Sequence, residues 1–277
     1  MPYFCTEDDV RIYYKETGDM SGKPVIGLHG WNSNHDMFDE LFAGMPEYHC
    51  IALDFRGVNR SSLPTNSLSM GRLAKDVEEL IIHLGLIGVT LIGYSMGASV
   101  LYKYIDLFGT GRLERTIICE MSPKLLNDDE WHEGLGQGKD DPMDDIVAVD
   151  KMLDDYDAYY RERALQNNPQ LAELPPRMRN NLFRGMLAPN PGYVMAAFYL
   201  SFVLQDYRSM LHKFDVPTGI FFADPGSVYQ PKTAYYLAEK IPAKTKVVIF
   251  DGCTHLFGLE KPDLFVKEVR AFMAEDI

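Results

Sequence analysis

Short apolar runs alternate with amphipathic segments through the first half of the chain. Four runs are mainly apolar, as expected of strands buried on both faces: 24–30, 50–57, 89–95 and 115–121. A mixed pattern at 11–17 predicts a further, early strand. The segment 71–85 has its apolar residues on one helical stripe and ends at Gly85, which predicts an amphipathic helix. Apolar strands that alternate with helices predict a parallel α/β sheet.

The pattern changes between residues 123 and 213. No convincing strand occurs in this region, and three helical stretches are predicted, near 143–165, 177–187 and 192–213. The alternation then resumes. Strands are predicted at 218–224 and 246–251, and helices at 231–241 and 262–274. The sequence therefore predicts a helical insertion within an α/β fold.

The composition narrows the class of protein. Apolar residues make up 46% of the chain and charged residues 24%, which is ordinary for a globular protein. The formal net charge of −13 argues against nucleic acid or an anionic membrane as a partner. No apolar run is long enough to span a membrane, and the N-terminus lacks the basic and apolar regions of a signal peptide.

The cysteines and the glycine pattern predict neither a disulfide framework nor a bound cofactor. Cys5, Cys50, Cys119 and Cys253 are far apart and form no CxxC pair, so we expect no zinc site and a reducing, cytoplasmic location. No phosphate loop, dinucleotide-binding motif or metal-ligand pattern is present, so we expect no cofactor and no metal. The sequence does not determine whether the protein is a monomer or an oligomer.

The strongest chemical signal is Gly93-Tyr94-Ser95-Met96-Gly97, a G-x-S-x-G motif between a predicted buried strand and a predicted helix. A side chain on either glycine would clash with the neighbouring strand or helix, so the motif predicts a tight turn. Ser95 would then direct its hydroxyl to the open end of the sheet. The backbone N–H of Met96 opens the helix, where the helix dipole favours a developing oxyanion. The pattern indicates a nucleophilic serine.

The motifs and their order resemble the α/β-hydrolase family, in particular its small esterase, haloperoxidase-like and lactonase members. The resemblance covers about two-thirds of the chain and is carried by HGW at 29–31, LDFRG at 53–57, GYSMG at 93–97, ICEMSP at 118–123 and CTHLFGLEKP at 253–262. It implies an eight-stranded, mostly parallel sheet flanked by helices, formed by residues 1–122 and 214–277. Residues 123–213 would then be a helical cap inserted between strands six and seven.

His255 is the candidate general base. It follows the predicted strand 246–251 in a loop that can bring an imidazole to the open edge of the sheet, where it would take the Ser95 proton. The resemblance implies that the backbone N–H of Trp31 joins that of Met96 in an oxyanion hole. We interpret His29 as a residue that fixes the Trp31 loop.

A second family-like segment, LDFRG, is interpreted as structural. Its Asp54 and Arg56 match a loop that helps to build the active-site floor in the family. Asn59 stands where the family usually has glycine, and asparagine tolerates the positive φ that such a turn requires.

Two residues are candidates for the acid that orients His255. Most members of the family place this acid after strand seven, where the chain has Ser227, with Asp224 three residues earlier. A subset of the family places it after strand six, which corresponds to Glu120. Glu120 lies in an apolar stretch, where an ionised carboxylate needs a partner, and its side chain is long enough to cross between neighbouring strand ends. We prefer Glu120 and keep Asp224 as the alternative.

The predicted cap is rich in aromatic residues and methionines, most of which are expected to pack the cap helices together. Some must face the crevice above Ser95, and we expect the substrate to contact Trp31, Tyr94, Tyr156, Phe198 and Phe202. The resemblance implies a serine hydrolase that cleaves ester or lactone bonds of a medium-sized hydrophobic small molecule through an acyl-enzyme. The alternatives are a carbon–carbon bond hydrolase of the same fold and a ligand receptor that turns over slowly.

Overall fold

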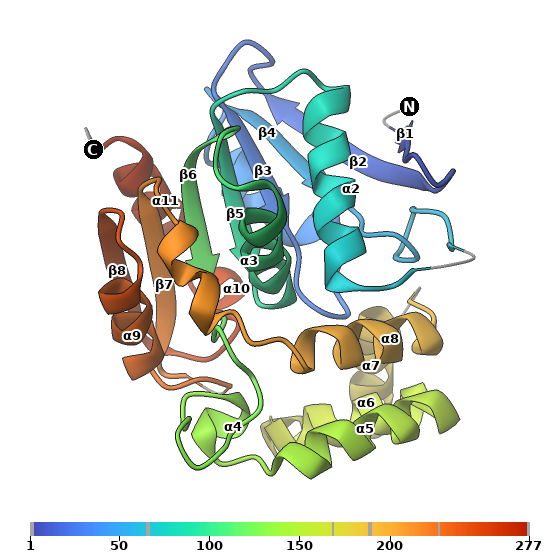
Figure 1. Ribbon diagram of the computed structural model, residues 1–277. Coiled ribbons are helices and arrows are strands. Elements are labelled where there is room, and N and C mark those ends of the chain that lie inside the picture. Colours follow the sequence, from blue (N-terminus) through green and yellow to red (C-terminus); the bar gives the residue numbers. More distant parts are fainter. Residues whose placement is uncertain (1–2, 65–66, 168, 188–189, 227, 276–277) are drawn as a thin grey trace.

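An eight-stranded sheet forms the centre of the protein (Figure 1). The structure, a computed structural model, describes residues 3–275 except 65–66, 168, 188–189 and 227. The strand order is β1-β2-β4-β3-β5-β6-β7-β8; β2 is antiparallel to both β1 and β4, and the other neighbours are parallel. This arrangement confirms the predicted, mostly parallel α/β sheet. The strands are β1 Tyr3–Cys5, β2 Arg11–Gly18, β3 Pro24–Leu28, β4 His49–Leu53, β5 Val89–Tyr94, β6 Leu113–Cys119, β7 Thr218–Pro225 and β8 Thr245–Cys253.

Helices cover both faces of the sheet. One apolar layer lies beneath α2 Met70–His83, α3 Met96–Phe108 and α9 Lys232–Lys240. A second layer lies beneath α1 Asp39–Ala43, α10 Phe257–Glu260 and α11 Pro262–Met273, with the 3₁₀ helix η1 His35–Phe38 preceding α1.

The central strands are apolar on both faces because both faces are covered. On β5, Leu91 packs into the layer beneath α2 and α3, whereas its neighbour Ile92 packs into the layer beneath α1 and α11. Both side chains are fully buried. Successive strand residues point to opposite faces, so a strand that is covered twice has apolar residues throughout.

The segment between β6 and β7 forms a helical layer beyond the carboxyl ends of the strands (Figure 1). In the part of the chain that the structure describes, this segment contains no strand longer than an isolated bridge. Its last helix, η3, packs against α3 and α9, so these final residues of the predicted insertion lie with the core. The helices of the segment are α4 Leu135–Gly138, α5 Pro142–Asp154, α6 Tyr156–Asn167, η2 Pro169–Glu173, α7 Pro176–Leu187, α8 Gly192–Val203 and η3 Arg208–Lys213.

Two of the predicted helical stretches are each divided in the structure, in both cases near an aspartate. Asp155 has an extended backbone, and its carboxylate accepts the N–H of Ala158 at 3.0 Å, so the stretch 143–165 divides into α5 and α6. Asp206 accepts the N–H of Arg208 at 3.1 Å, and the stretch 192–213 divides into α8 and η3. The three-residue strand β1 was not predicted because its apolar pattern is too short.

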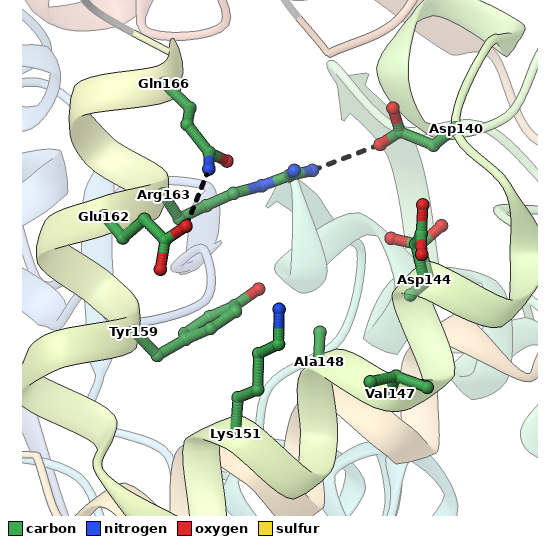
Figure 2. A pocket seen from close by; sticks show the side chains of 10 residues that line it. Asp140, Asp144, Val147, Ala148, Lys151, Tyr159, Glu162, Arg163 and Gln166 are labelled. Carbon is green, nitrogen blue, oxygen red and sulfur yellow. Dashed lines mark hydrogen bonds and ion pairs between the residues drawn. The ribbon is translucent and has the colours of Figure 1, made fainter.

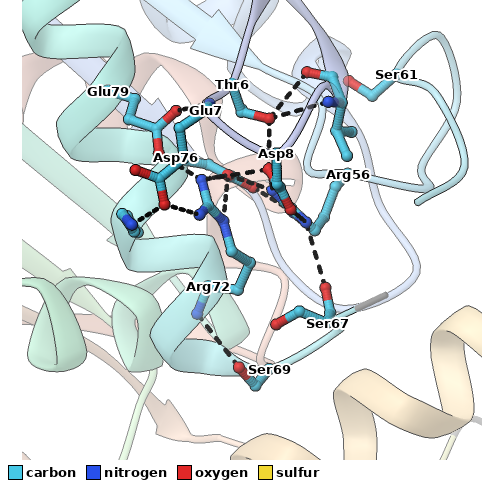
Figure 3. Close-up of polar contacts among 12 residues, drawn as sticks. Thr6, Glu7, Asp8, Arg56, Ser61, Ser67, Ser69, Arg72, Asp76 and Glu79 are labelled. Atoms are coloured by element: carbon cyan, nitrogen blue, oxygen red, sulfur yellow. Dashed lines mark hydrogen bonds and ion pairs between the residues drawn. The ribbon is translucent and has the colours of Figure 1, made fainter. Parts of the chain in front are cut away.

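A buried ion-pair network ties three segments of the core together (Figure 3). The fully buried guanidinium of Arg56 donates to both carboxylate oxygens of Asp76 on α2 at 2.7 Å. It also donates to both oxygens of Asp8, at 2.8 and 2.9 Å, and Arg72 donates to Asp76. This geometry confirms the structural interpretation of Arg56. The Arg56 guanidinium holds the pKa of Asp8 well below its usual range, so the stabilisation is present at neutral pH and is lost as the pH falls.

Replacement of the central arginine tests this network. Arg56→Met should lower the free energy of unfolding by about 3–5 kcal/mol, because Asp76 would stay buried without its main counter-charge. Chemical denaturation at neutral pH measures this loss. The control is Arg112→Met, which removes an ion pair with Glu78 at a 42% exposed arginine and should cost less than about 1 kcal/mol. Equal losses in the two variants would contradict the interpretation.

Candidate active site

Ser95 lies in the turn between β5 and α3, and its backbone φ is +53°. The turn is compressed on both sides. A Cβ atom on Gly93 would lie 2.5 Å from Cα of Ala98, and one on Gly97 would overlap the carbonyl oxygen of Leu28. The two glycines of the motif are therefore required by close packing, as the sequence predicts. The strained turn directs the serine side chain away from the sheet.

His255 lies in the loop between β8 and α10, and its ring reaches the serine. Its Nε2 lies 2.9 Å from Oγ of Ser95. The predicted nucleophile and base are thus within hydrogen-bond distance, although 160 residues separate them in the chain.

Glu120 completes the hydrogen-bonded chain. Its Oε2 lies 3.0 Å from Nδ1 of His255, and its Oε1 accepts the N–H of Ala223 at 2.6 Å. The residue follows β6, is fully buried, and has a φ of +49°, in the region that non-glycine residues rarely adopt. A buried carboxylate that contacts an imidazole on one oxygen and an amide on the other has the partners that its charge needs.

The alternative acid, Asp224, is not positioned for this role. Its residue is exposed at the end of β7, and among the described residues no hydrogen bond joins its carboxylate to His255. The side chain thus stays in solvent while Glu120 occupies the position beside Nδ1. Ser227, at the position where most of the family has the acid, lies outside the described residues.

The backbone N–H groups of Met96 and Trp31 lie near Ser95. The N–H of Met96 is at the first position of α3, where intrahelical acceptors are missing. Gly30 approaches the serine so closely that a Cβ atom on it would lie 3.4 Å from Cβ of Ser95, which brings the next residue, Trp31, to the same place. Among the described residues, neither N–H has a hydrogen-bond acceptor.

His29 fixes the loop that carries Trp31. The N–H of Phe55 donates to Nε2 of His29 at 3.2 Å, and Nδ1 lies 2.8 Å from the carbonyl oxygen of Gly30. These two contacts assign the proton to Nδ1. Burial lowers the pKa of His29 to about 4, so the ring is neutral at physiological pH. Asn59, with a φ of +46°, adopts the positive φ expected of it.

A cavity of about 250 Å³ lies above Ser95 and His255, between the sheet and the helical layer between β6 and β7, for which we keep the name cap. Trp31 and Phe202, both predicted to contact substrate, line it. The other large lining residues were not among the predicted substrate contacts. They come mainly from α6, α8 and the segment after β7: Tyr159, Tyr160, Arg163, Tyr199 and Tyr229.

Three of the residues predicted to contact substrate do not line this cavity. Tyr94 packs into the apolar layer between the sheet and the helices α10 and α11. Phe198 is fully buried within the apolar interior. Tyr156 lies behind Trp31, with their rings edge to face at 5.9 Å. None of the three is among the residues that line the cavity.

Tyr94 instead holds the histidine loop. Its hydroxyl donates to the carbonyl oxygen of His255 at 2.7 Å and accepts the N–H of Gly258 at 3.3 Å. Burial raises the pKa of Tyr94 well above its ordinary value, so the hydroxyl keeps the proton that it donates. Tyr94, which directly precedes Ser95, thus holds the backbone of His255 by a hydrogen bond.

Neither a metal-binding cluster nor a membrane-spanning helix occurs among the described residues. No cluster of imidazole, thiol or carboxylate groups among them has the arrangement that could hold a metal ion. No helix among them is both long and apolar enough to cross a membrane.

Comparison with known proteins identifies the family. The family model for the alpha/beta hydrolase fold matches residues 23–262, most of the chain. The chain belongs to the α/β-hydrolase family. One curated relative, a non-heme chloroperoxidase from Kitasatospora aureofaciens, is 25% identical over 262 residues, which cover 92% of each chain. The relatives of this hydrolase family member thus include haloperoxidases.

Solved structures show the same fold. An esterase from Exiguobacterium antarcticum has a TM-score of 0.85 at 22% identity and covers 99% of both chains. The enol-lactonase from Burkholderia xenovorans has a TM-score of 0.81 at 19% identity, with 99% of this chain and 100% of the other covered. At these identities the similarity establishes the fold alone.

The role of Tyr94 in holding the histidine loop can be tested directly. Tyr94→Phe keeps the ring but removes both hydroxyl bonds, and we expect a fluorophosphonate to label Ser95 about tenfold more slowly. The control is Tyr104→Phe, which removes another buried hydroxyl bond, to Glu78 at 2.7 Å. Labelling followed by mass spectrometry gives both rates. An unchanged rate in Tyr94→Phe would refute the role.

Proposed function

We propose that this α/β hydrolase is a serine hydrolase that cleaves carboxylic ester or lactone bonds of medium-sized hydrophobic substrates. The observation that carries the proposal is the continuous chain of contacts from Ser95 through His255 to Glu120, at 2.9 and 3.0 Å. Such a chain allows the imidazole to remove the serine proton and to be stabilised as a cation.

Acylation would begin when His255 accepts the Ser95 proton through Nε2. The serine oxygen attacks the carbonyl carbon, and the π electrons of the carbonyl move to its oxygen. The resulting oxyanion accepts hydrogen bonds from the N–H groups of Trp31 and Met96. Collapse of this intermediate breaks the ester bond, and His255 gives its proton to the leaving alkoxide. Glu120 keeps the proton on Nδ1 and stabilises the imidazolium.

Deacylation uses the same groups in the reverse order. His255 takes a proton from water, whose oxygen attacks the acyl carbon. The bond between the acyl carbon and Oγ of Ser95 then breaks, the imidazolium returns its proton to Oγ, and the acid is released. For a lactone, the alcohol stays attached to the acyl group, so a single hydroxy acid is released.

The cavity supports a hydrophobic substrate of moderate size. Its volume of about 250 Å³ lies near the lower end of small-molecule sites, and rings from Trp31, Tyr199 and Phe202 form much of its wall. Rigid aromatic rings bury apolar groups at a small entropic cost. We therefore expect neutral apolar acyl groups to be preferred over choline-like cations and over peptides.

A second activity is favoured by the haloperoxidase relatives. If hydrogen peroxide replaces water in deacylation, His255 takes the peroxide proton and the acyl-enzyme is released as a peracid. This reaction needs the same three residues and no additional group.

Replacement of the nucleophile tests the proposed function. Ser95→Ala should bind neutral esters as the wild type does but lose the burst of alcohol release and all sustained turnover, because no acyl-enzyme can form. Stopped-flow measurement of alcohol release checks both. Full turnover in this variant would overturn the mechanism. In the wild type, release of a single equivalent without further turnover would indicate a receptor.

The identity of the acid gives a separate prediction. Glu120→Gln should lower kcat by several orders of magnitude, up to about 10⁴-fold, because the amide cannot hold the same imidazole tautomer or stabilise its cation. Asp224→Asn should stay within about threefold of the wild type, since its side chain does not contact the imidazole. Steady-state kinetics on one ester, under identical conditions, compares the two. A large loss confined to Asp224→Asn would assign the role to that residue.

A further inference from the structure

A second cavity, of about 260 Å³, lies in the cap between α5 and α6 (Figure 2). Two residues of α6, Tyr159 and Arg163, line both this space and the cavity above Ser95. The two cavities are therefore neighbours that share part of their lining. We call the second space the cap cavity.

The cap cavity presents hydrogen-bond donors that are not fully used. The Lys151 ammonium and the Tyr159 hydroxyl point into the space from α5 and α6, and neither has a hydrogen-bond partner among the described residues (Figure 2). Arg163 donates from one nitrogen, Nη2, to Asp140 at 3.1 Å. No bond within the described part of the chain uses its other nitrogens.

Acceptors stand opposite these donors. The Asp144 carboxylate has no hydrogen-bond partner among the described residues, and Glu162 accepts only the amide of Gln166, at 3.1 Å. Asp145 is 4% exposed and accepts the hydroxyl of Tyr199, a residue that lines the cavity above Ser95, at 2.8 Å. Carboxylates and cations thus line the same cavity, so a ligand of either charge would face a like charge.

We propose that the cap cavity binds an uncharged, hydroxylated part of the substrate, such as a diol or polyol, while the ester or lactone carbonyl lies at Ser95. The inference rests on the proposed function and adds a substrate class to it. A hydroxyl both donates and accepts, so a group with several hydroxyls satisfies Lys151 and Tyr159 as well as Asp144. The ring of Tyr159 offers an apolar surface to the carbon skeleton of such a group.

A panel of p-nitrophenyl esters tests the proposal. The acyl chains have six, eight or ten carbons and end in an alkyl group, a vicinal diol, a carboxylate or an ammonium. At the best chain length, the wild type should hydrolyse the diol ester with a kcat/KM about tenfold above that of the alkyl ester, as expected for two added hydrogen bonds. Lys151→Met and Asp144→Asn should each lower this ratio toward one.

The control is Arg161→Met, which lies on the same helix, pairs with Asp157, and lines neither cavity. Its diol-to-alkyl ratio should equal that of the wild type. Equal rates on diol and alkyl esters, or a preference for the carboxylate or ammonium ester, would overturn the inference while leaving the hydrolase function intact.

A binding measurement tests the subsite without turnover. Titration calorimetry of the wild type with the corresponding diol and alkyl amides should show tighter binding of the diol, again by about tenfold. If the wild type hydrolyses no ester of the panel, the proposed function fails, and the calorimetric comparison alone decides the subsite. Equal affinities for the two amides would overturn it.

Discussion

The site depends on one buried carboxylate, because Glu120 is fully buried and an ionised group there must be matched by its neighbours. The imidazole of His255 lies 3.0 Å from one oxygen, and the amide of Ala223 donates to the other at 2.6 Å. These contacts fix the orientation of the ring and therefore the 2.9 Å approach of Nε2 to Ser95. The fold supplies them by ending β5 and β6 side by side, each followed directly by a residue with positive φ.

Trp31 connects this rigid core to the cap. Its indole N–H donates to the carbonyl oxygen of Met195 on α8 at 2.8 Å, and its ring contacts Tyr156, Tyr160 and Tyr199 of the cap. Its own backbone N–H lies near Ser95 and has no acceptor among the residues that the structure describes. The position of the helices between β6 and β7 is thereby coupled to the proposed oxyanion donor, and the wall of the cavity above Ser95 continues to the Ser95–His255 pair.

The sequence predicts the core and the serine–histidine pair well, because buried parallel strands and the glycines around Ser95 leave direct patterns. The sequence alone left Asp224 open beside Glu120, because the place of the Glu120 carboxylate next to His255 depends on the positive φ of Glu120 and on the pairing of β6 with β7. The cap contacts could not be predicted from composition. Helix α8 is apolar and largely buried, so no pattern shows that Phe202 faces the cavity while Phe198 does not. Tyr94 could have been placed, because it lies two residues after Ile92 and shares its face.

The central claim is that a carbonyl substrate becomes covalently attached to Ser95 during turnover. Rapid acid quench of the wild-type protein with a neutral ester, followed by peptide mass spectrometry, measures this attachment directly. The account predicts a peptide containing Ser95 whose mass increases by that of the acyl group, formed within the first turnover and lost as the substrate is consumed. An acyl group on another residue, or efficient turnover with no acylated peptide at any quench time, would contradict it.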